Sequence, residues 1–242
     1  MGFKYLNKGS DIFDGDDSED VYANEEQLKS RLEYYQGQLL AQNESSPIDE
    51  RIKTLLEVGR IQVERYEGAD AWEKSSKAFN LAHDSELWEL AVEACGVMYL
   101  SEGPESLKAL AHAIWLGVIF PIDPEITVAM IQHLIDESPE EADTRAVAAA
   151  VAHYITSVRC GEEDDLTFFA LQMLTSVADK HSHISDQSSF DLWRKTLELD
   201  KPEVFLKKLS GALDILAENE WWVDQDKIRA QIAREAIDET KH

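Results

Sequence analysis

Four side chains in the middle of the chain have types and spacings that suit metal binding or proton transfer. His133 and Glu137 are four residues apart, a spacing that places both on one face of a helix. His112 and His153 lie in the predicted helices on either side and could converge with His133. Imidazoles and carboxylates ligate zinc and act as general acids and bases. This set predicts a metal-binding or enzymatic protein, and the competing interpretation is helix histidines making ordinary hydrogen bonds where helices meet.

A second set of possible metal ligands lies near residue 180. Asp179, His181 and His183 alternate with other residues, and Asp186 follows. They fall at a predicted helix end and in a polar loop, where ligands are accessible, although zinc needs three or four ligands at roughly 2.0–2.3 Å. A histidine near a helix C-terminus is also favoured by the helix dipole alone. The pattern therefore indicates either a metal site or a polar helix end.

The usual catalytic motifs are missing from the sequence. The glycines are scattered and form no phosphate-binding loop, and no serine stands in a Gly-x-Ser-x-Gly setting. A Glu-x-x-His pair occurs once, at Glu239 and His242, whereas a di-iron carboxylate bundle needs two such pairs facing its core. The sequence therefore favours a protein that is not an enzyme, with no catalytic residue and no cofactor.

Acidic residues dominate the composition. The chain has 48 Asp and Glu against 23 Lys and Arg, and its formal net charge at pH 7 is −25. Such a surface repels nucleic-acid phosphates and anionic lipids, so direct binding to nucleic acid or to a membrane is not expected. A protein partner with a basic segment suits this charge, as does an inhibitor that imitates nucleic acid. The alternative is a set of solvated helix faces with no partner.

The cysteines and the apolar runs predict a cytoplasmic protein. Cys95 and Cys160 are 65 positions apart, which matches no metal or redox motif and is typical of reduced thiols. The longest apolar run is far shorter than the ~18 residues of a membrane span. The first residues, Met1 to Lys8, have no apolar core like that of a signal peptide.

The elements that would position these residues are helices at a regular spacing. Predicted starts of alternate helices are 38 to 40 residues apart, at Pro47, Glu86, Pro124, Glu162 and Pro202. No stretch alternates like a strand. Units of this size indicate an all-α fold, a right-handed array of about five antiparallel helical hairpins that is α-solenoid-like and spans residues 24–242 as a single domain. The alternative is a non-repeating helical bundle with hairpins of similar size.

The first unit carries a family resemblance. Gly59, Ala71 and Ala78 fall at the small-residue offsets of the tetratricopeptide pattern, while Ser75 stands where that pattern has a large aromatic residue and Phe79 comes four positions later. Over about 35 residues the chain thus resembles tetratricopeptide-like helical repeat proteins at the level of the hairpin. The resemblance implies an α-solenoid-like protein and carries over no functional residue.

Two segments could anchor a protein partner. Residues 1–23 crowd acidic side chains together and predict a disordered acidic tail, in which Ile12 and Phe13 could form a short docking motif. Trp221 and Trp222 form the turn before the last helix. Adjacent side chains point in different directions, so one ring is expected to seal the last hairpin and the other to be exposed as an anchor.

An apolar corner divides the chain in the middle. Phe120 and Ile122 flank Pro121 just before the helix that begins at Pro124, whereas the other unit junctions are polar. This pattern predicts a buried corner between the second and third hairpins.

Together these features lead to one main hypothesis and two rivals. The main hypothesis is a non-catalytic cytoplasmic scaffold, adaptor or assembly chaperone that binds a protein partner along the concave face of stacked hairpins. The rivals are the metal-binding or enzymatic protein and the acidic inhibitor that imitates nucleic acid.

Overall fold

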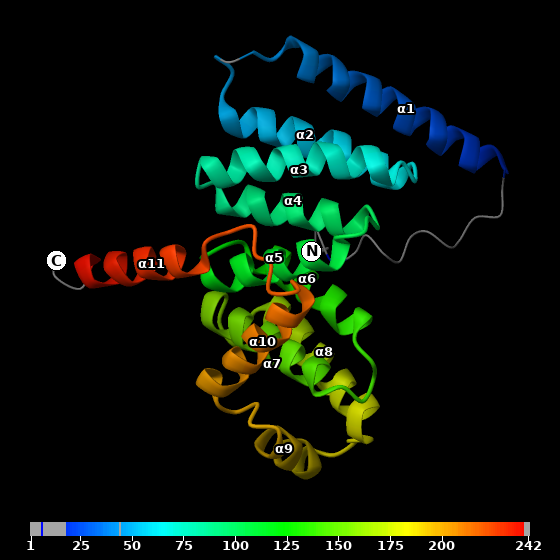
Figure 1. The fold of residues 1–242 in the computed structure, drawn as a ribbon. Helices are drawn as coiled ribbons and strands as arrows, with labels where there is room; N and C mark the ends of the chain where they lie inside the picture. The colour runs from blue at the N-terminus through cyan, green and yellow to red at the C-terminus, as the bar shows by residue number, and fades with distance from the viewer. Residues whose placement is uncertain (1–5, 7–17, 44, 240–242) are drawn as a thin grey trace.

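The chain folds into α-helices (Figure 1). The computed structural model describes residues 6, 18–43 and 45–239, and these residues form eleven helices and no strand. The predicted all-α fold class is therefore confirmed. The helices are α1 (Ser18–Ala41), α2 (Ile48–Glu64), α3 (Gly68–Asp84), α4 (Trp88–Leu100), α5 (Ser106–Ile119), α6 (Pro124–Glu137), α7 (Asp143–Arg159), α8 (Asp165–Ser182), α9 (Gln187–Thr196), α10 (Pro202–Leu216) and α11 (Gln225–Glu239).

Local signals in the sequence account for where the helices begin. Helices α2, α4, α6, α8 and α10 each begin within three residues of the predicted starts. Asp123 and Asp164 cap α6 and α8, because their carboxylates accept hydrogen bonds from the free backbone N–H groups of Glu125 and Leu166. Pro124 and Pro202 occupy the first turns of α6 and α10, where a missing N–H costs nothing.

The N-terminal helix begins earlier than the sequence predicts. Helix α1 starts at Ser18, whereas the prediction placed residues 1–23 in a disordered tail. Glu19 and Asp20 stand in its first turn, where the positive end of the helix dipole favours acidic residues. Ile12 and Phe13, the proposed docking motif, lie outside the described residues.

Helices that are neighbours in sequence pack side by side from α1 to α8 (Figure 1). Alternate helices also touch, α2 with α4 and α4 with α6, as in stacked hairpins. Helix α10 departs from this order, because it returns to pack against α7 and α5. The C-terminal part of the chain thus covers the middle of the stack, and α11 projects away from the body (Figure 1).

Several helices end without glycine. Glu86 and Glu198 have φ of 54° and 59°, in the left-handed region that glycine usually occupies. At both ends the next N–H reaches back to the last helical turn: Leu87 donates to the Ala82 carbonyl at 2.9 Å, and Leu199 donates to the Arg194 carbonyl at 2.8 Å. These hydrogen bonds satisfy carbonyls that the helix leaves open, and the turns form although the sequence lacks the glycine signal.

The apolar corner after α5 is partly buried. Ile122 is 4% exposed and lies in the core, whereas Phe120 is half-buried and stacks on Trp88 with ring centroids 4.6 Å apart. Pro121 is exposed. The corner is therefore anchored by Ile122, with Phe120 at its edge.

Among the described residues, no helix combines the length and the apolar character needed to cross a lipid bilayer.

Candidate functional site

The two adjacent tryptophans before α11 fold back onto α3 and α5. The Trp222 ring stacks on His112 with centroids 4.3 Å apart, and meets Phe79 edge-on at 5.6 Å. The Trp221 ring lies 5.8 Å from that of Trp115, and its Nε1–H donates to the Asp214 carboxylate at 3.0 Å. Both tryptophans are half-buried, so much of each ring is committed to contacts within the chain.

His112 fixes this loop through both ring nitrogens. The Trp222 backbone N–H donates to His112 Nε2 at 2.7 Å, which requires that Nε2 carry no proton. The proton therefore sits on Nδ1, which donates to the Lys108 carbonyl at 2.7 Å. Burial lowers the pKa of His112 from 6.5 to about 4. His112 is thus neutral at pH 7, and neither ring nitrogen is free to bind a metal ion.

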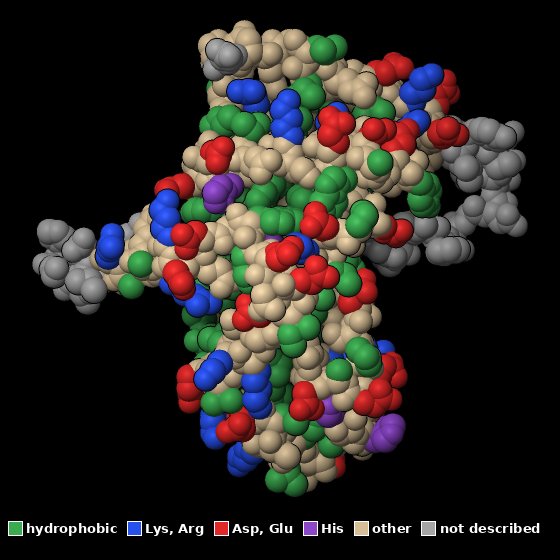
Figure 2. All heavy atoms as spheres, viewed as in Figure 1, with side chains coloured by type: hydrophobic (Ala, Val, Ile, Leu, Met, Phe, Trp, Pro, Cys, Tyr) green, Lys and Arg blue, Asp and Glu red, His purple; other side chains and the backbone are tan. Residues whose placement is uncertain are grey.

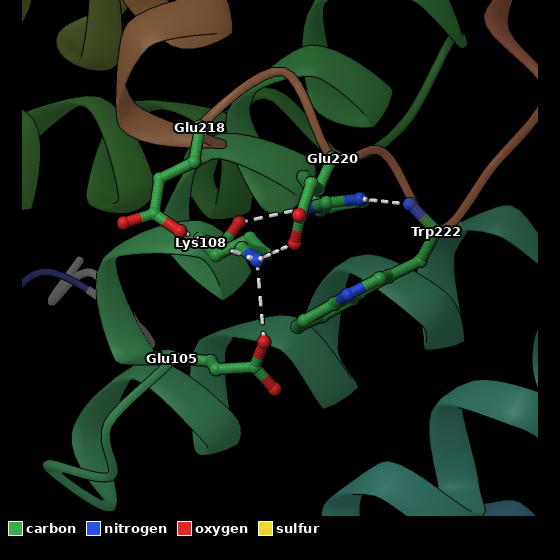
Figure 3. Close-up of polar contacts among 6 residues, drawn as sticks. Glu105, Lys108, Glu218, Glu220 and Trp222 are labelled. Carbon is green, nitrogen blue, oxygen red and sulfur yellow. Dashed lines mark hydrogen bonds and ion pairs between the residues drawn. The ribbon is translucent and has the colours of Figure 1, made fainter.

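One turn earlier in α5, Lys108 joins three carboxylates (Figure 3). Its ammonium lies 2.8 Å from Glu220, 3.2 Å from Glu105 and 3.6 Å from Glu218. The lysine side chain is 5% exposed, whereas the three carboxylates are on the surface. The hydrogen bond to Glu220 is the main cause of the raised pKa of Lys108, and it lowers the pKa of Glu220. This cluster holds the segment after α10 against α5.

Replacing Lys108 with methionine should lower the melting temperature by a few degrees, because the loop loses its ion pairs while the apolar stem is kept. The raised pKa of Lys108 gives stability that is present below pH 10.5 and lost above it. The lowered pKa of Glu220 gives stability that is present above pH 4.5 and lost as the pH falls further. The melting temperatures of the wild type and the Lys108→Met variant should therefore differ most between pH 4.5 and pH 10.5. They should converge outside this range. A constant difference at all pH values would contradict this assignment.

His133 and Glu137 meet through a tyrosine. The Tyr99 hydroxyl of α4 donates to the Glu137 carboxylate at 2.8 Å, and the Tyr99 ring lies 4.8 Å from the His133 ring. Burial raises the pKa of Tyr99, with a further contribution from the hydrogen bond to Glu137, and burial lowers the pKa of His133. The pair therefore belongs to the seam between α4 and α6.

His153 lies elsewhere, in a pocket that it lines together with Arg194. The four predicted ligands His112, His133, Glu137 and His153 are thus divided among three places. In the described part of the chain, no three His, Cys, Asp or Glu side chains come together to hold a metal ion. Helical spacing keeps His133 and Glu137 together in the seam between α4 and α6, whereas His112 contacts the loop before α11 and His153 lines the pocket near α9, so the three histidines do not converge.

The second predicted set forms a helix end. His181 Nε2 lies 3.3 Å from the Asp143 carboxylate, and Nδ1 accepts a hydrogen bond from Trp193 Nε1 at 3.3 Å. His183 has φ of 54° and caps α8 in the left-handed conformation. The Asp186 carboxylate caps α9 by accepting from the Ser189 N–H. These side chains therefore serve to end one helix and to begin the next.

The sequence does not predict the ion-pair cluster around Lys108. Glu218 and Glu220 resemble any exposed acids, and nothing in the sequence links them to a residue about 110 positions earlier. Only the position of Lys108 indicates such a cluster. It is a lone cation just before a long apolar run, and a cation in a buried helix needs acidic partners.

The fold and this site define a class, an all-α protein of packed helical hairpins whose C-terminal loop folds back onto its middle helices. Comparisons of the chain with protein-family models, with curated proteins and with solved structures find no match.

Proposed function

We propose that the protein is a non-catalytic cytoplasmic scaffold, adaptor or assembly chaperone that binds a protein partner through a basic segment of that partner. The observation that carries this proposal is an acidic surface along α2, α4 and α6. This surface, here called the α2–α4–α6 face, consists of Glu57, Arg60, Glu89, Glu93, Leu100 and Glu137.

Contacts between the three helices support treating this surface as one face. Arg60 of α2 forms ion pairs with Glu57 of the same helix and with Glu93 of α4. Glu89 and Glu93 are one turn apart, so both lie on the same face of α4, with Glu89 exposed and Glu93 partly buried. Tyr99 then links α4 to Glu137 of α6. An extended segment that crosses the three helices would therefore meet carboxylates on each of them.

The charge of the face favours a cationic ligand. Arg60 is shared by two of the carboxylates, whereas Glu89 accepts a hydrogen bond from the backbone N–H of Asp123 and Glu137 accepts one from the Tyr99 hydroxyl. The whole chain has 48 acidic and 23 basic residues, a formal net charge of −25, so there are too few Lys and Arg side chains to pair with every carboxylate. Such a surface attracts a basic segment and speeds its association. Leu100, which is 45% exposed, offers an apolar contact at the same place.

The two rival functions have less support. The proposed metal ligands lie apart in three places, and His112 uses both ring nitrogens within the fold. An inhibitor that imitates nucleic acid would align its acids at phosphate-like spacing. On the face drawn in Figure 2, acidic side chains are interspersed with Lys and Arg over many helices, with no such row.

A binding measurement with matched charge variants tests the proposal. In the first variant, Glu57→Gln, Glu89→Gln and Glu137→Gln remove three charges from the face. In the control, Asp179→Asn, Asp191→Asn and Glu203→Gln remove three exposed acids from α8, α9 and α10. Fluorescence anisotropy with a labelled Lys- and Arg-rich peptide should show at least roughly tenfold weaker binding for the face variant, and a change below about threefold for the control. Binding should weaken steeply as the salt concentration rises.

A pull-down from native lysate extends the test to the natural partner. The proposal is supported by a protein that the wild type retains at low salt and releases at high salt. The control variant should retain the same protein, and the face variant should not. The proposal would be contradicted if both variants retained the partner equally, or if the affinity for the basic peptide fell equally in the face variant and in the control.

A further inference from the structure

A pocket of about 200 Å³ lies among helices α7, α8, α9 and α10. Leu174, Leu199 and Phe205 form apolar walls, and Ser157, His153 and Arg194 contribute polar groups. Its volume is below the roughly 300–1,000 Å³ of pockets that hold drug-sized ligands. The pocket is therefore suited to a small molecule, and it lies far along the chain from the α2–α4–α6 face.

Two polar atoms at this pocket have no partner among the described residues. They are Arg194 Nε and Ser157 Oγ, and both are buried from solvent. The Arg194 guanidinium also makes no ion pair with any described residue, although the protein is strongly acidic, and it lies 5.9 Å from the centre of the Phe190 ring. Buried polar groups are normally hydrogen-bonded, so these two atoms call for a partner that the described residues do not supply.

A carboxylate is the group that best satisfies these two donors. Guanidinium groups bind carboxylates through two parallel hydrogen bonds, and a serine hydroxyl can donate a third. Arg194 and Ser157 both line the pocket, so a ligand bound there lies beside both residues. His153 next to them is kept largely uncharged by burial, so Arg194 is the principal cation for such a group.

Two acidic residues at the same pocket argue against a simple anion. Glu162 and Asp200 line it and are both exposed, which places their charges on its solvent side. They would repel a ligand that carries negative charge alone, and they would attract an ammonium group. A ligand with a carboxylate at one end and an ammonium beside it matches both halves of the pocket.

We infer that this pocket binds a small zwitterion with an apolar side chain, of the chemical class of the apolar α-amino acids. The carboxylate binds Arg194 and Ser157, the ammonium faces Glu162 and Asp200, and the side chain packs against Leu174, Leu199 and Phe205. Because Ser157 lies on α7 and Arg194 on α9, the ligand also joins two helices. This inference is independent of the proposed binding face.

Three probes of the same shape test the assignment. Leucine carries both charged groups, 4-methylpentanoate lacks the ammonium, and 3-methylbutylamine lacks the carboxylate. Titrations of the full chain followed by ¹H–¹⁵N NMR should show saturable shifts with leucine at millimolar concentration or below, centred on residues around the pocket. Each of the other two probes should bind at least roughly tenfold more weakly, because a polar group of the pocket is then left unpaired.

Two substitutions in the pocket and one beside it complete the test. Arg194→Gln and Ser157→Ala should each weaken leucine binding, the former at least roughly tenfold. Lys195→Gln removes the adjacent exposed cation and should leave the affinity unchanged. The inference is overturned if leucine causes no shift at 10 mM or about that level, if 4-methylpentanoate binds as tightly as leucine, or if both pocket variants are folded and bind normally.

Discussion

Replacing His112 with alanine should lower the free energy of unfolding by about 3–5 kcal/mol. The side chain is fully buried, and its ring stacks on Trp222. Alanine would leave a cavity and would also leave the Trp222 N–H without an acceptor. Urea denaturation measures the loss. His83→Ala is the control, because the His83 side chain is 36% exposed, and its loss should cost less than about 1 kcal/mol.

Replacing His112 with phenylalanine separates packing from hydrogen bonding. Phenylalanine keeps an aromatic ring against Trp222 but can neither accept from the Trp222 N–H nor donate to the Lys108 carbonyl. An unpaired buried donor costs about 1–3 kcal/mol, so the phenylalanine variant should lie between the wild type and the alanine variant. A phenylalanine variant as stable as the wild type would show that the two hydrogen bonds contribute nothing.

The pH dependence of stability checks the same histidine. Because burial lowers the pKa of His112 from 6.5 to about 4, its folded form binds a proton less readily than its unfolded form. The favourable contribution is therefore complete above pH 6.5 and is lost as the pH falls from 6.5 towards 4. The full loss corresponds to about 3 kcal/mol. The phenylalanine variant lacks this titration, so the stability difference between it and the wild type should shrink over that range, while the carboxylates titrate equally in both.

The sequence predicts the helices better than it predicts what they contact. Helix starts depend on local chemistry, such as Pro124 in the first turn of α6 and the Asp123 cap before it, and the start of α6 at Pro124 was predicted correctly. The exception is α1, whose start lies in a stretch where acidic repulsion suggested disorder although acids also favour a helix N-terminus. Local rules thus decide most helix boundaries, and they fail where two of them oppose each other.

The candidate sites depend on contacts between distant residues, which spacing does not reveal. His112 was correctly placed on a helix, but its partner is a backbone N–H 110 residues later. The return of α10 to α7 and α5 makes that contact, and no local pattern specifies it. The same holds for Arg194 and Ser157, which meet at one pocket from α9 and α7. Helical periodicity predicts that a side chain is buried and leaves open which other element covers it.

The corner after α5 was predicted from its apolar residues, yet a cation holds it together. The Arg159 guanidinium, at the end of α7, donates to the carbonyls of Phe120 at 2.8 Å and of Val118 and Ile122 at 3.1 Å each. These carbonyls come from the last turn of α5 and the break that follows, where no helix supplies donors. Burial lowers the pKa of Arg159 from 12.5, and the group remains charged at neutral pH.

Replacing Arg159 with methionine should therefore lower the free energy of unfolding by about 2–4 kcal/mol. Methionine keeps the apolar stem and removes all three hydrogen bonds, so the loss measures the polar contacts. Arg159→Lys should recover less than half of it, because an ammonium is a point donor and cannot reach three carbonyls held in a fixed geometry. Urea denaturation gives both values, and Arg234→Met, at an exposed position of α11, should change stability by less than about 0.5 kcal/mol.

A small loss in the methionine variant would mean that the apolar residues hold the corner without help. The close approach of α5 and α6 makes that outcome unexpected. A Cβ atom added at Gly117 would lie 2.9 Å from the Thr127 hydroxyl oxygen, and that hydroxyl donates to the Gly117 carbonyl at 3.2 Å. The two helices can remain this close when the chain between them keeps its sharp turn, and the carbonyls of that turn are the ones that Arg159 binds. Loss of Arg159 should therefore weaken the packing of α5 on α6 as well as the corner itself.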